Sequence, residues 1–285
     1  MMKSTEAAAP GYVIRPDVGW FDVDLREVLR YRDLVWLLVR RDFVSIYKQT
    51  ILGPLWFILK PLLTTLTFVV IFGRVAKLST DGLPQLLFYF SGTIMWFYFS
   101  DSFLKISTFF TTNAKLFQKV YFPRLIIPLS ILLSSFFGWL LQFATFLGFV
   151  AFYKWKGFPV ETGSVALLTP VLLLLVAALG LGLGIFVSAL TTKYRDLSFL
   201  LSFGIQLLMY ATPVIYPMSS IPEKYQWLVL VNPLAPLIEA FRFGFLGEGT
   251  FAWRYLAVSG ATTAAVLVFG LMIFGRVEKT FVDTV

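Results

Sequence analysis

The sequence predicts an all-α integral membrane protein with six transmembrane helices, an N-terminal amphipathic interface helix, and a re-entrant external helical hairpin before the last span. Three observations predict this class. Hydrophobic residues make up 58% of the 285 residues and charged residues only 14%, against about 25% charged residues in soluble domains. The apolar residues gather in runs long enough to cross a bilayer, which takes about 20 residues. One further apolar region, near the C-terminal end, is divided by an Asn-Pro pair.

The composition excludes several kinds of chemistry. The chain has no Cys and no His, so it lacks thiolate nucleophiles, the usual general base and the commonest metal ligands. It also contains no Gly-Lys dipeptide and therefore no phosphate-binding loop for nucleotide hydrolysis. We expect no metal, cofactor or catalytic residue in this chain. The net charge of +8 is interpreted through its distribution across loops, and no nucleic-acid partner is expected.

Residues 1–23 are expected to form a flexible cytoplasmic tail, because they mix Pro, Gly and charge without an apolar segment. The pair Asp22 and Asp24 matches the D-x-D pattern that holds a metal and nucleotide sugar in some glycosyltransferases. It precedes a helix with no soluble α/β domain around it, so helix capping explains it better.

Residues 24–50 form the predicted amphipathic interface region, and residues 51–285 the six-span domain. Leu34, Leu37, Leu38 and Val44 stand near helical spacing, which predicts an apolar face on the inner membrane surface. The basic residues expected to contact phospholipid headgroups or other phosphates are Arg40, Arg41 and Lys48. A plain membrane anchor fits the same pattern equally well.

Six runs qualify as bilayer-crossing helices, in which interior prolines such as Pro61 and Pro170 are tolerated. They are Leu55–Phe72, Leu86–Phe110, Leu125–Tyr153, Val165–Leu190, Leu197–Ile215 and Tyr255–Phe274. If the N-terminus is cytoplasmic, fifteen Lys and Arg residues lie in inner segments and seven in outer segments. This bias predicts that both termini are cytoplasmic.

The second span contains two ionisable residues, Asp101 and Lys105, four positions apart. Ionisable groups in a bilayer are costly and often functional. The structural interpretation is favoured: the two side chains pair with each other, and Lys105 reaches the inner interface.

The first inner loop, Asn113–Phe122, is short, basic and amphipathic. Asn113 is expected to cap a short helix through its side chain, and Pro123 to end it. Leu116, Phe117 and Val120 fall on one face, while Lys115 and Lys119 remain solvated. Such an element is suited to pressing against another protein.

Aromatic residues are frequent, and most are expected to form an interface belt or to face lipid. The functional alternative is a surface for stacking sugar rings. Its candidate residues are Phe57, Trp96, Tyr98, Tyr210 and Tyr216. The last two are preferred, because Thr212, Pro213 and Pro217 would break the fifth span and open its backbone.

Two features concern the later part of the chain. Gly180, Gly182 and Gly184 form a small-residue stripe that predicts close packing of the fourth span against another helix. Ile221–Leu246 consists of two apolar pieces around Asn232-Pro233, each too short to cross a bilayer. A hairpin dipping into the outer leaflet is favoured over an interfacial loop, with Glu239 and Arg242 paired inside it.

Taken in order, several local patterns resemble the membrane subunit of polysaccharide-exporting ABC transporters, within the type-two ABC exporter permease family. The resemblance covers about residues 24–285. It rests on six segments: Leu52–Trp56 with Lys60-Pro61, Asn113–Arg124, Lys193–Leu197, Thr212–Pro217, Asn232–Pro236 and Arg276–Asp283. The N-terminal tail is longer than in the compact form of the family.

The resemblance implies a homodimeric permease of the bacterial inner membrane, joined to two copies of a separate ATPase that binds ATP and Mg. The coupling helix that contacts this ATPase would contain Asn113, Lys115–Phe117 and Lys119–Phe122, which includes Tyr121. Arg195 and Asp196, in the second inner loop, would take part in the same contact. Spans one and five would line the pathway. The substrate would be a lipid-linked glycan such as O-antigen, capsule or teichoic acid.

Three alternative functions stand beside polysaccharide export. An exporter of small molecules, such as a drug or antibiotic, would use the same permease plan. A membrane-embedded enzyme acting on lipid-linked sugars is disfavoured by the lack of His and Cys and by the few intramembrane carboxylates. A passive channel is disfavoured because the sequence has no charged ring or filter-like repeat.

Overall fold

The structure, a computed structural model, describes residues 25–48, 50–194 and 196–284. The predicted tail, the D-x-D pair and Arg195 therefore lie outside the described residues. Within these ranges every regular element is a helix, as predicted. The α-helices are α1 (Leu25–Arg30), α2 (Arg32–Lys48), α3 (Trp56–Phe68), α4 (Gln85–Ser107), α5 (Phe109–Thr112), α6 (Ala114–Phe117), α7 (Ile126–Trp155), α8 (Thr169–Lys193), α9 (Leu197–Tyr210), α10 (Glu223–Leu230), α11 (Leu234–Leu246) and α12 (Trp253–Thr284). Short 3-10 or π-helical turns are η1 (Gly53–Leu55), η2 (Val69–Val75), η3 (Ser164–Leu168) and η4 (Met218–Ser220).

Among the described residues, four helical stretches are long and apolar enough to cross a membrane. They are α3 with its flanking turns (Gly53–Val75), α7, η3 with α8 (Ser164–Lys193), and Trp253–Gly275 of α12. Helices α10 and α11 meet at a bend of 106°. If this pair is counted as one broken span, it is the fifth such stretch. Helix α9 is shorter, and α4 is less apolar because serines, tyrosines, Asp101 and Lys105 interrupt its apolar residues.

Several predicted boundaries are corrected. The second predicted span ends at Ser107, and α5 continues after Thr108 as a separate turn. The fifth ends at Tyr210, just before the residues expected to break it. Pro61 lies inside α3 as predicted, whereas Pro170 occupies the first turn of α8, where its missing N–H costs nothing.

Helix α4 is the centre of the bundle. It packs against α3, α7, α8, α9 and α11, and most of its residues are buried. Phe88, Tyr89, Phe90 and Phe99 are almost completely inaccessible. These aromatic side chains therefore form the core of the chain, which corrects the expectation of an interface belt or lipid-facing positions for this cluster.

The glycine stripe of α8 serves two helices. A Cβ atom at Gly182 would lie 2.7 Å from the Cα atom of Leu267 in α12, and one at Gly184 would lie 2.7 Å from the side chain of Ile106 in α4. Gly270 of α12 approaches Gly182 from the opposite side. The predicted close packing is confirmed: Gly184 allows the close approach of α4, and Gly182 allows the close approach of α12.

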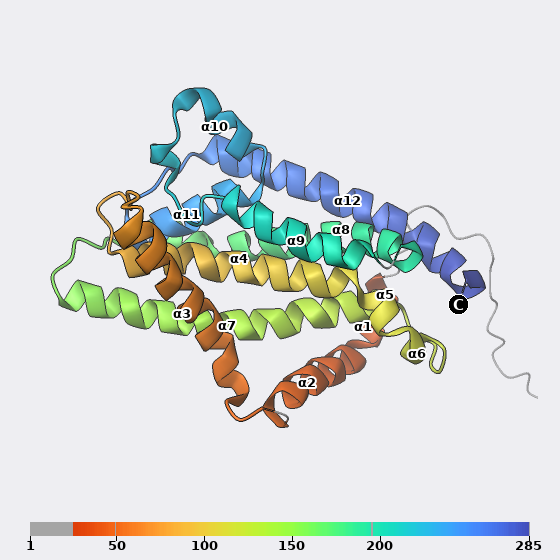
Figure 1. Cartoon of the computed structure of the whole chain (residues 1–285). Helices are drawn as coiled ribbons and strands as arrows, with labels where there is room; N and C mark the ends of the chain where they lie inside the picture. Colours follow the sequence, from red (N-terminus) through yellow and green to blue (C-terminus); the bar gives the residue numbers. More distant parts are fainter. Residues whose placement is uncertain (1–24, 49, 195, 285) are drawn as a thin grey trace, which may run out of the picture.

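The long helices share a common direction, while α3 crosses them obliquely (Figure 1). Helices α2 and α6 lie toward the same end of the bundle as the C-terminus of the chain. The loops that follow α3 and α7, together with α10, lie toward the opposite end. The first inner loop and the hairpin are thus separated by the length of the bundle.

Replacing Gly182 by Ala should lower the free energy of unfolding by about 1–3 kcal/mol, because the backbone of α12 must shift to admit the methyl group. Gly148→Ala in α7 is the matched control, since a Cβ atom there meets nothing within 4 Å. Its stability should be kept or slightly raised. Thermal unfolding of both variants in detergent checks this, and equal losses would contradict the assigned packing.

Candidate functional site

The first inner loop folds against the chain's own bundle. Phe117, at the end of α6, lies with its ring centroid 5.9 Å from that of Phe110 and 5.7 Å from that of Phe122. Phe110 in turn stacks on Phe274 of α12 at 5.9 Å. Leu116 packs on the same inner core. The two bulky residues predicted to face a partner are therefore half-buried within this chain.

Two details of the loop differ from the prediction. The Asn113 side chain does not cap α6; its amide donates a hydrogen bond to the Phe109 carbonyl at 3.0 Å, which also accepts the Asn113 backbone N–H at 3.0 Å. Helix α6 also ends at Phe117, well before Pro123. Phe117 and Phe122 are about 140° apart on a continuous helix, so the helix must stop for both rings to enter one cluster.

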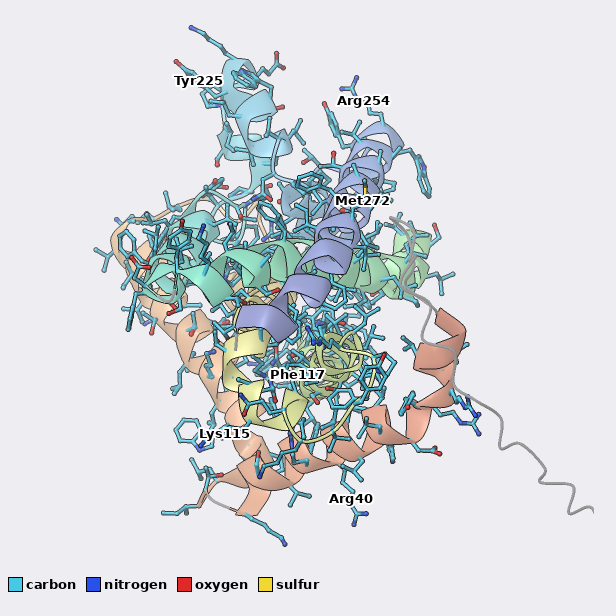
Figure 2. The ribbon with its side chains drawn as sticks, turned by 90° about the vertical axis from the view of Figure 1, so that its right-hand side faces the viewer. Arg40, Lys115, Phe117, Tyr225, Arg254 and Met272 are labelled. Carbon is cyan, nitrogen blue, oxygen red and sulfur yellow. The ribbon has the colours of Figure 1, made fainter. Side chains whose placement is uncertain are left out.

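The outward face of this loop carries different residues. The side chains of Val120 and Tyr121 are 54% and 88% exposed, whereas Phe122 is buried. Lys115 and Lys119 are exposed as predicted. Figure 2 shows Lys115 pointing away from the bundle end, while Phe117 lies within it. A partner at this end would therefore meet Tyr121 and Val120 between two lysines.

The polar contacts next to this loop lie at the ends of α4 and α8. The Thr191 hydroxyl near the end of α8 donates to the Ser107 carbonyl at 2.5 Å, which ties α8 to the end of α4. Asp196, at the start of α9, is exposed, and its side chain makes no capping bond. Arg195 lies outside the described residues.

Helix α2 is anchored by aromatic contacts. The Phe43 ring lies 5.9 Å from that of Phe137 in α7 and 5.5 Å from that of Phe57 near the start of α3. Leu38 is buried, whereas Leu37 is 60% exposed, so the predicted apolar face is divided between the bundle and the surroundings.

The basic residues of α2 differ in their pairing. Arg41 forms an ion pair with Asp42 at 2.9 Å and lines a cavity of about 300 Å³ shared with Lys105 of α4. Arg40 and Lys48 are exposed. Arg40 points away from the bundle (Figure 2). This places the predicted phosphate-contacting residues on one surface without joining them in one site.

The predicted stacking residues do not form one surface. Trp96 is buried in the core at 2% exposure, where it cannot contact a substrate in this conformation. Tyr98 is 5% exposed and lines an apolar cavity of about 880 Å³ bordered mainly by α7 and α8. Phe57 is half-buried under Phe43, and Tyr216 is half-buried. Burial raises the pKa of the Tyr216 phenol, so it stays neutral. Tyr210 is 49% exposed at the end of α9.

The predicted pair of Asp101 with Lys105 is wrong. Asp101 accepts a hydrogen bond from Lys60 of α3 at 3.2 Å, and the Lys60 ammonium also lies 4.6 Å from the centre of the Phe97 ring. The Asp101 side chain faces α3, whereas Lys105, one turn later, faces the cavity beside α2. Sequence spacing within α4 could not reveal Lys60, because the ion pair joins two helices.

Two polar rows, exposed except at the half-buried Thr64, lie on helices that pack on α4. On α3 the row contains Lys60, Thr64 and Thr67, and on α9 it contains Ser202, Gln206 and Tyr210. Both rows have helical spacing, so each stays on one face. Such a row is unfavourable against lipid tails, and it suits a face turned toward water or another chain.

The opposite end of the bundle contains a buried ion pair. Glu239 and Arg242 of α11 are 2% and 1% exposed, and they pair as predicted. The Arg242 guanidinium also donates to the Pro213 carbonyl at 3.0 Å and lies 3.9 Å from the centre of the Phe88 ring in α4. Glu239 accepts a hydrogen bond from the Thr250 backbone N–H at 3.1 Å. The pair thus joins α11 to α4 and to the two loops that flank the hairpin.

The break after α9 is held by a second polar contact. Asn232, at the bend of the hairpin, donates from its side-chain amide to the Thr212 hydroxyl at 2.7 Å. Its side-chain oxygen accepts from the Leu234 N–H at 3.0 Å, which satisfies the first backbone donor of α11. Thr212 and Val214 are fully buried. The segment after α9 is therefore packed into the protein and is not an open surface.

Comparison with known proteins points to one family. A family model described as "ABC-2 type transporter" matches residues 33–246. An O-antigen export system permease protein RfbA of Klebsiella pneumoniae is 29% identical over 258 residues, covering 88% of this chain and 94% of that protein. The protein of that name in Myxococcus xanthus is 26% identical, covering 92% and 98%. The polysialic acid transport protein KpsM of Escherichia coli is 26% identical, covering 87% and 94%.

Breaking the buried ion pair should destabilise the protein. Arg242→Met leaves a buried carboxylate without its cation, and Glu239→Gln leaves a buried cation; each should cost about 3–5 kcal/mol. The double variant removes both charges and should recover part of this loss. Thermal unfolding in detergent measures all three, and a double variant as unstable as the two losses added together would contradict the assigned coupling.

Proposed function

Because the chain belongs to the ABC-2 type transporter family, we propose that it is the permease subunit of an ATP-driven exporter of a lipid-linked polysaccharide, of the O-antigen or capsular kind, across the bacterial inner membrane. The similarity to O-antigen export permeases over 94–98% of their length carries this proposal. A shared membrane plan of that extent includes both the inner loop and the outer hairpin. The chain itself is a transporter subunit and not an enzyme.

The proposed membrane arrangement has six spans: α3, α4, α7, α8, α9 and α12. Helix α4 is counted because most of its polar residues are buried against other helices, where they do not meet lipid. Asp101 is half-buried against Lys60, and Lys105 is exposed near the end of the helix. Helix α2 would lie at the inner interface with Arg40 and Lys48 toward phosphates, and the α10–α11 pair would be the external re-entrant hairpin. Both termini would be cytoplasmic, consistent with the excess of basic residues in the inner segments.

The pathway is proposed to form between two copies of this chain. The polar rows of α3 and α9 would line this pathway. The Tyr210 ring would stack on a sugar, and Lys60 and Gln206 would hold water in the pathway. Apolar residues on the same two helices stay exposed in one chain, such as Leu63, Phe199 and Phe203, and a second copy would cover them. This supports a homodimer.

The partner ATPase, in two copies that bind ATP and Mg, would act at the first inner loop. The aromatic cluster around Phe117 ties this loop to α5 and to α12. A push on Tyr121 and Val120 would thereby be transmitted to the bundle without bending the loop alone. Lys115 and Lys119 flank the contact, and Asp196 lies in the neighbouring inner loop.

Deleting the gene should abolish surface display of the host's long-chain glycan and leave its lipid-linked precursor inside the cell. Immunoblotting of surface glycan and extraction of the carrier lipid measure the two pools, and the intact gene should restore display. Normal glycan display in the deletion strain, with altered sensitivity to a toxic small molecule, would contradict the proposal and favour small-molecule export.

Tyr121→Ala combined with Val120→Asp should remove copurification of the ATPase and its stimulation by the permease, while the thermal unfolding temperature stays close to wild type. Both side chains are largely exposed, so their loss leaves the core intact. Tyr225→Ala at the far end is the matched control, since this tyrosine is 50% exposed. Phe117→Ala should instead cost about 3 kcal/mol of stability. Unchanged assembly with the first variant would refute the contact.

A further inference from the structure

A cavity of about 400 Å³ lies beneath the bend between α10 and α11, beside the start of α12. Its polar edge consists of Gln226, Glu239, Thr250 and Tyr255, and its apolar wall includes Phe243 and Phe251. This size falls within the range of small-ligand pockets. The polar rows of α3 and α9 contribute no residue to it.

The polar edge is built around a buried carboxylate. Glu239 is 2% exposed; one oxygen pairs with Arg242, and the other accepts from the Thr250 N–H at 3.1 Å. Gly249 has a φ of +123°, and a Cβ atom there would lie 3.1 Å from that second oxygen. A glycine is therefore needed both for the loop conformation and for the space beside the carboxylate.

Two further groups direct hydrogen-bonding atoms to this edge. The Gln226 amide nitrogen donates to the Ile221 carbonyl at 3.1 Å, which orients its oxygen as an acceptor. The Tyr255 hydroxyl accepts from the Arg254 guanidinium at 2.6 Å, so its own proton is available for donation. The edge thus offers mostly acceptors and two hydroxyl groups, those of Thr250 and Tyr255.

Part of the cavity wall is aromatic. The rings of Phe243 and Phe251 stack on each other, with their centroids 5.5 Å apart and an angle of 12° between their planes. The parts of the rings that this contact leaves uncovered give the cavity a rigid apolar surface, which suits the C–H face of a polar ligand.

The charges select among ligand classes. Arg242 already neutralises Glu239, which disfavours a cation, and no Lys or Arg is among the residues that line the cavity, which disfavours an anion. A lipid tail would leave the acceptors without donors. A neutral ligand rich in hydroxyl groups satisfies the acceptors and covers the aromatic wall.

We propose that this cavity is a binding site for one neutral sugar unit of the exported glycan, on the outer side of the membrane. This rests on the proposed function for the identity of the polymer and on the cavity for the site. A sugar bound there would contact both arms of the hairpin and would hold the polymer as it leaves the pathway.

The test uses the complex of permease and ATPase in lipid nanodiscs. The probe is the repeat oligosaccharide released by mild acid from the host's own surface glycan, and calorimetry measures its dissociation constant. Gln226→Leu removes one hydrogen-bonding group from the polar edge, and Phe251→Ala removes part of the aromatic wall; each should weaken binding by about tenfold or more. Tyr225→Ala is the control on α10, because Tyr225 points away from the bundle (Figure 2) and does not line the cavity.

Binding that is absent in the wild-type complex, or equal in the wild type and the Gln226→Leu variant, would overturn the site. If Phe251→Ala fails to fold, Gln226→Leu still decides the matter, since its side chain is only half-buried. The two proposals fail differently. Export lost on gene deletion without cavity-dependent binding removes the sugar site alone, whereas export unaffected by deletion removes the proposed function.

Discussion

The ion pair of Glu239 and Arg242 is the constraint on which the outer half of this protein depends. An arginine taken out of water needs its charge matched and its donors used. Arg242 has its charge matched by the Glu239 carboxylate, donates to the Pro213 carbonyl and lies over the face of Phe88, and its Nε is the donor left without a partner. Each partner belongs to a different segment, so a single side chain fixes how α11, the break after α9 and the central helix α4 lie together.

The inner half depends on aromatic packing instead. The rings of Phe109 and Phe110 in α5 contact Phe274 of α12, and Phe117 in turn packs on both of them and on Phe122. The loop that carries Phe117 and Phe122 is thereby packed onto α5. The two ends thus use different physics, charge satisfaction at one and dispersion at the other. Helix α4, buried along most of its length, joins them as a rigid rod.

The order of helices, the bend at Asn232 and the glycine stripe were predictable because each is written in local patterns: hydropathy, a helix-breaking residue and a repeat of small side chains. The Glu239–Arg242 pair was predictable for the same reason, as its members are three residues apart. The partner of Asp101 was not, because Lys60 precedes it by 41 residues. Tyr121 belongs to the predicted coupling helix, but no sequence pattern within that segment indicates that Tyr121, rather than Phe117, faces outward.

The sequence by itself determined the membrane class, the absence of a nucleotide-binding loop from this chain, and the segments able to carry function, since these follow from residue type and spacing. Only the tertiary structure decided which side of each segment is exposed and can contact a partner or a substrate. Trp96 and Tyr98 became core because α4 is enclosed by five other helices, and the cavity beneath α10 exists only because distant segments meet around Glu239. Burial depends on neighbours that approach from elsewhere in the chain, and no pattern within one helix specifies them.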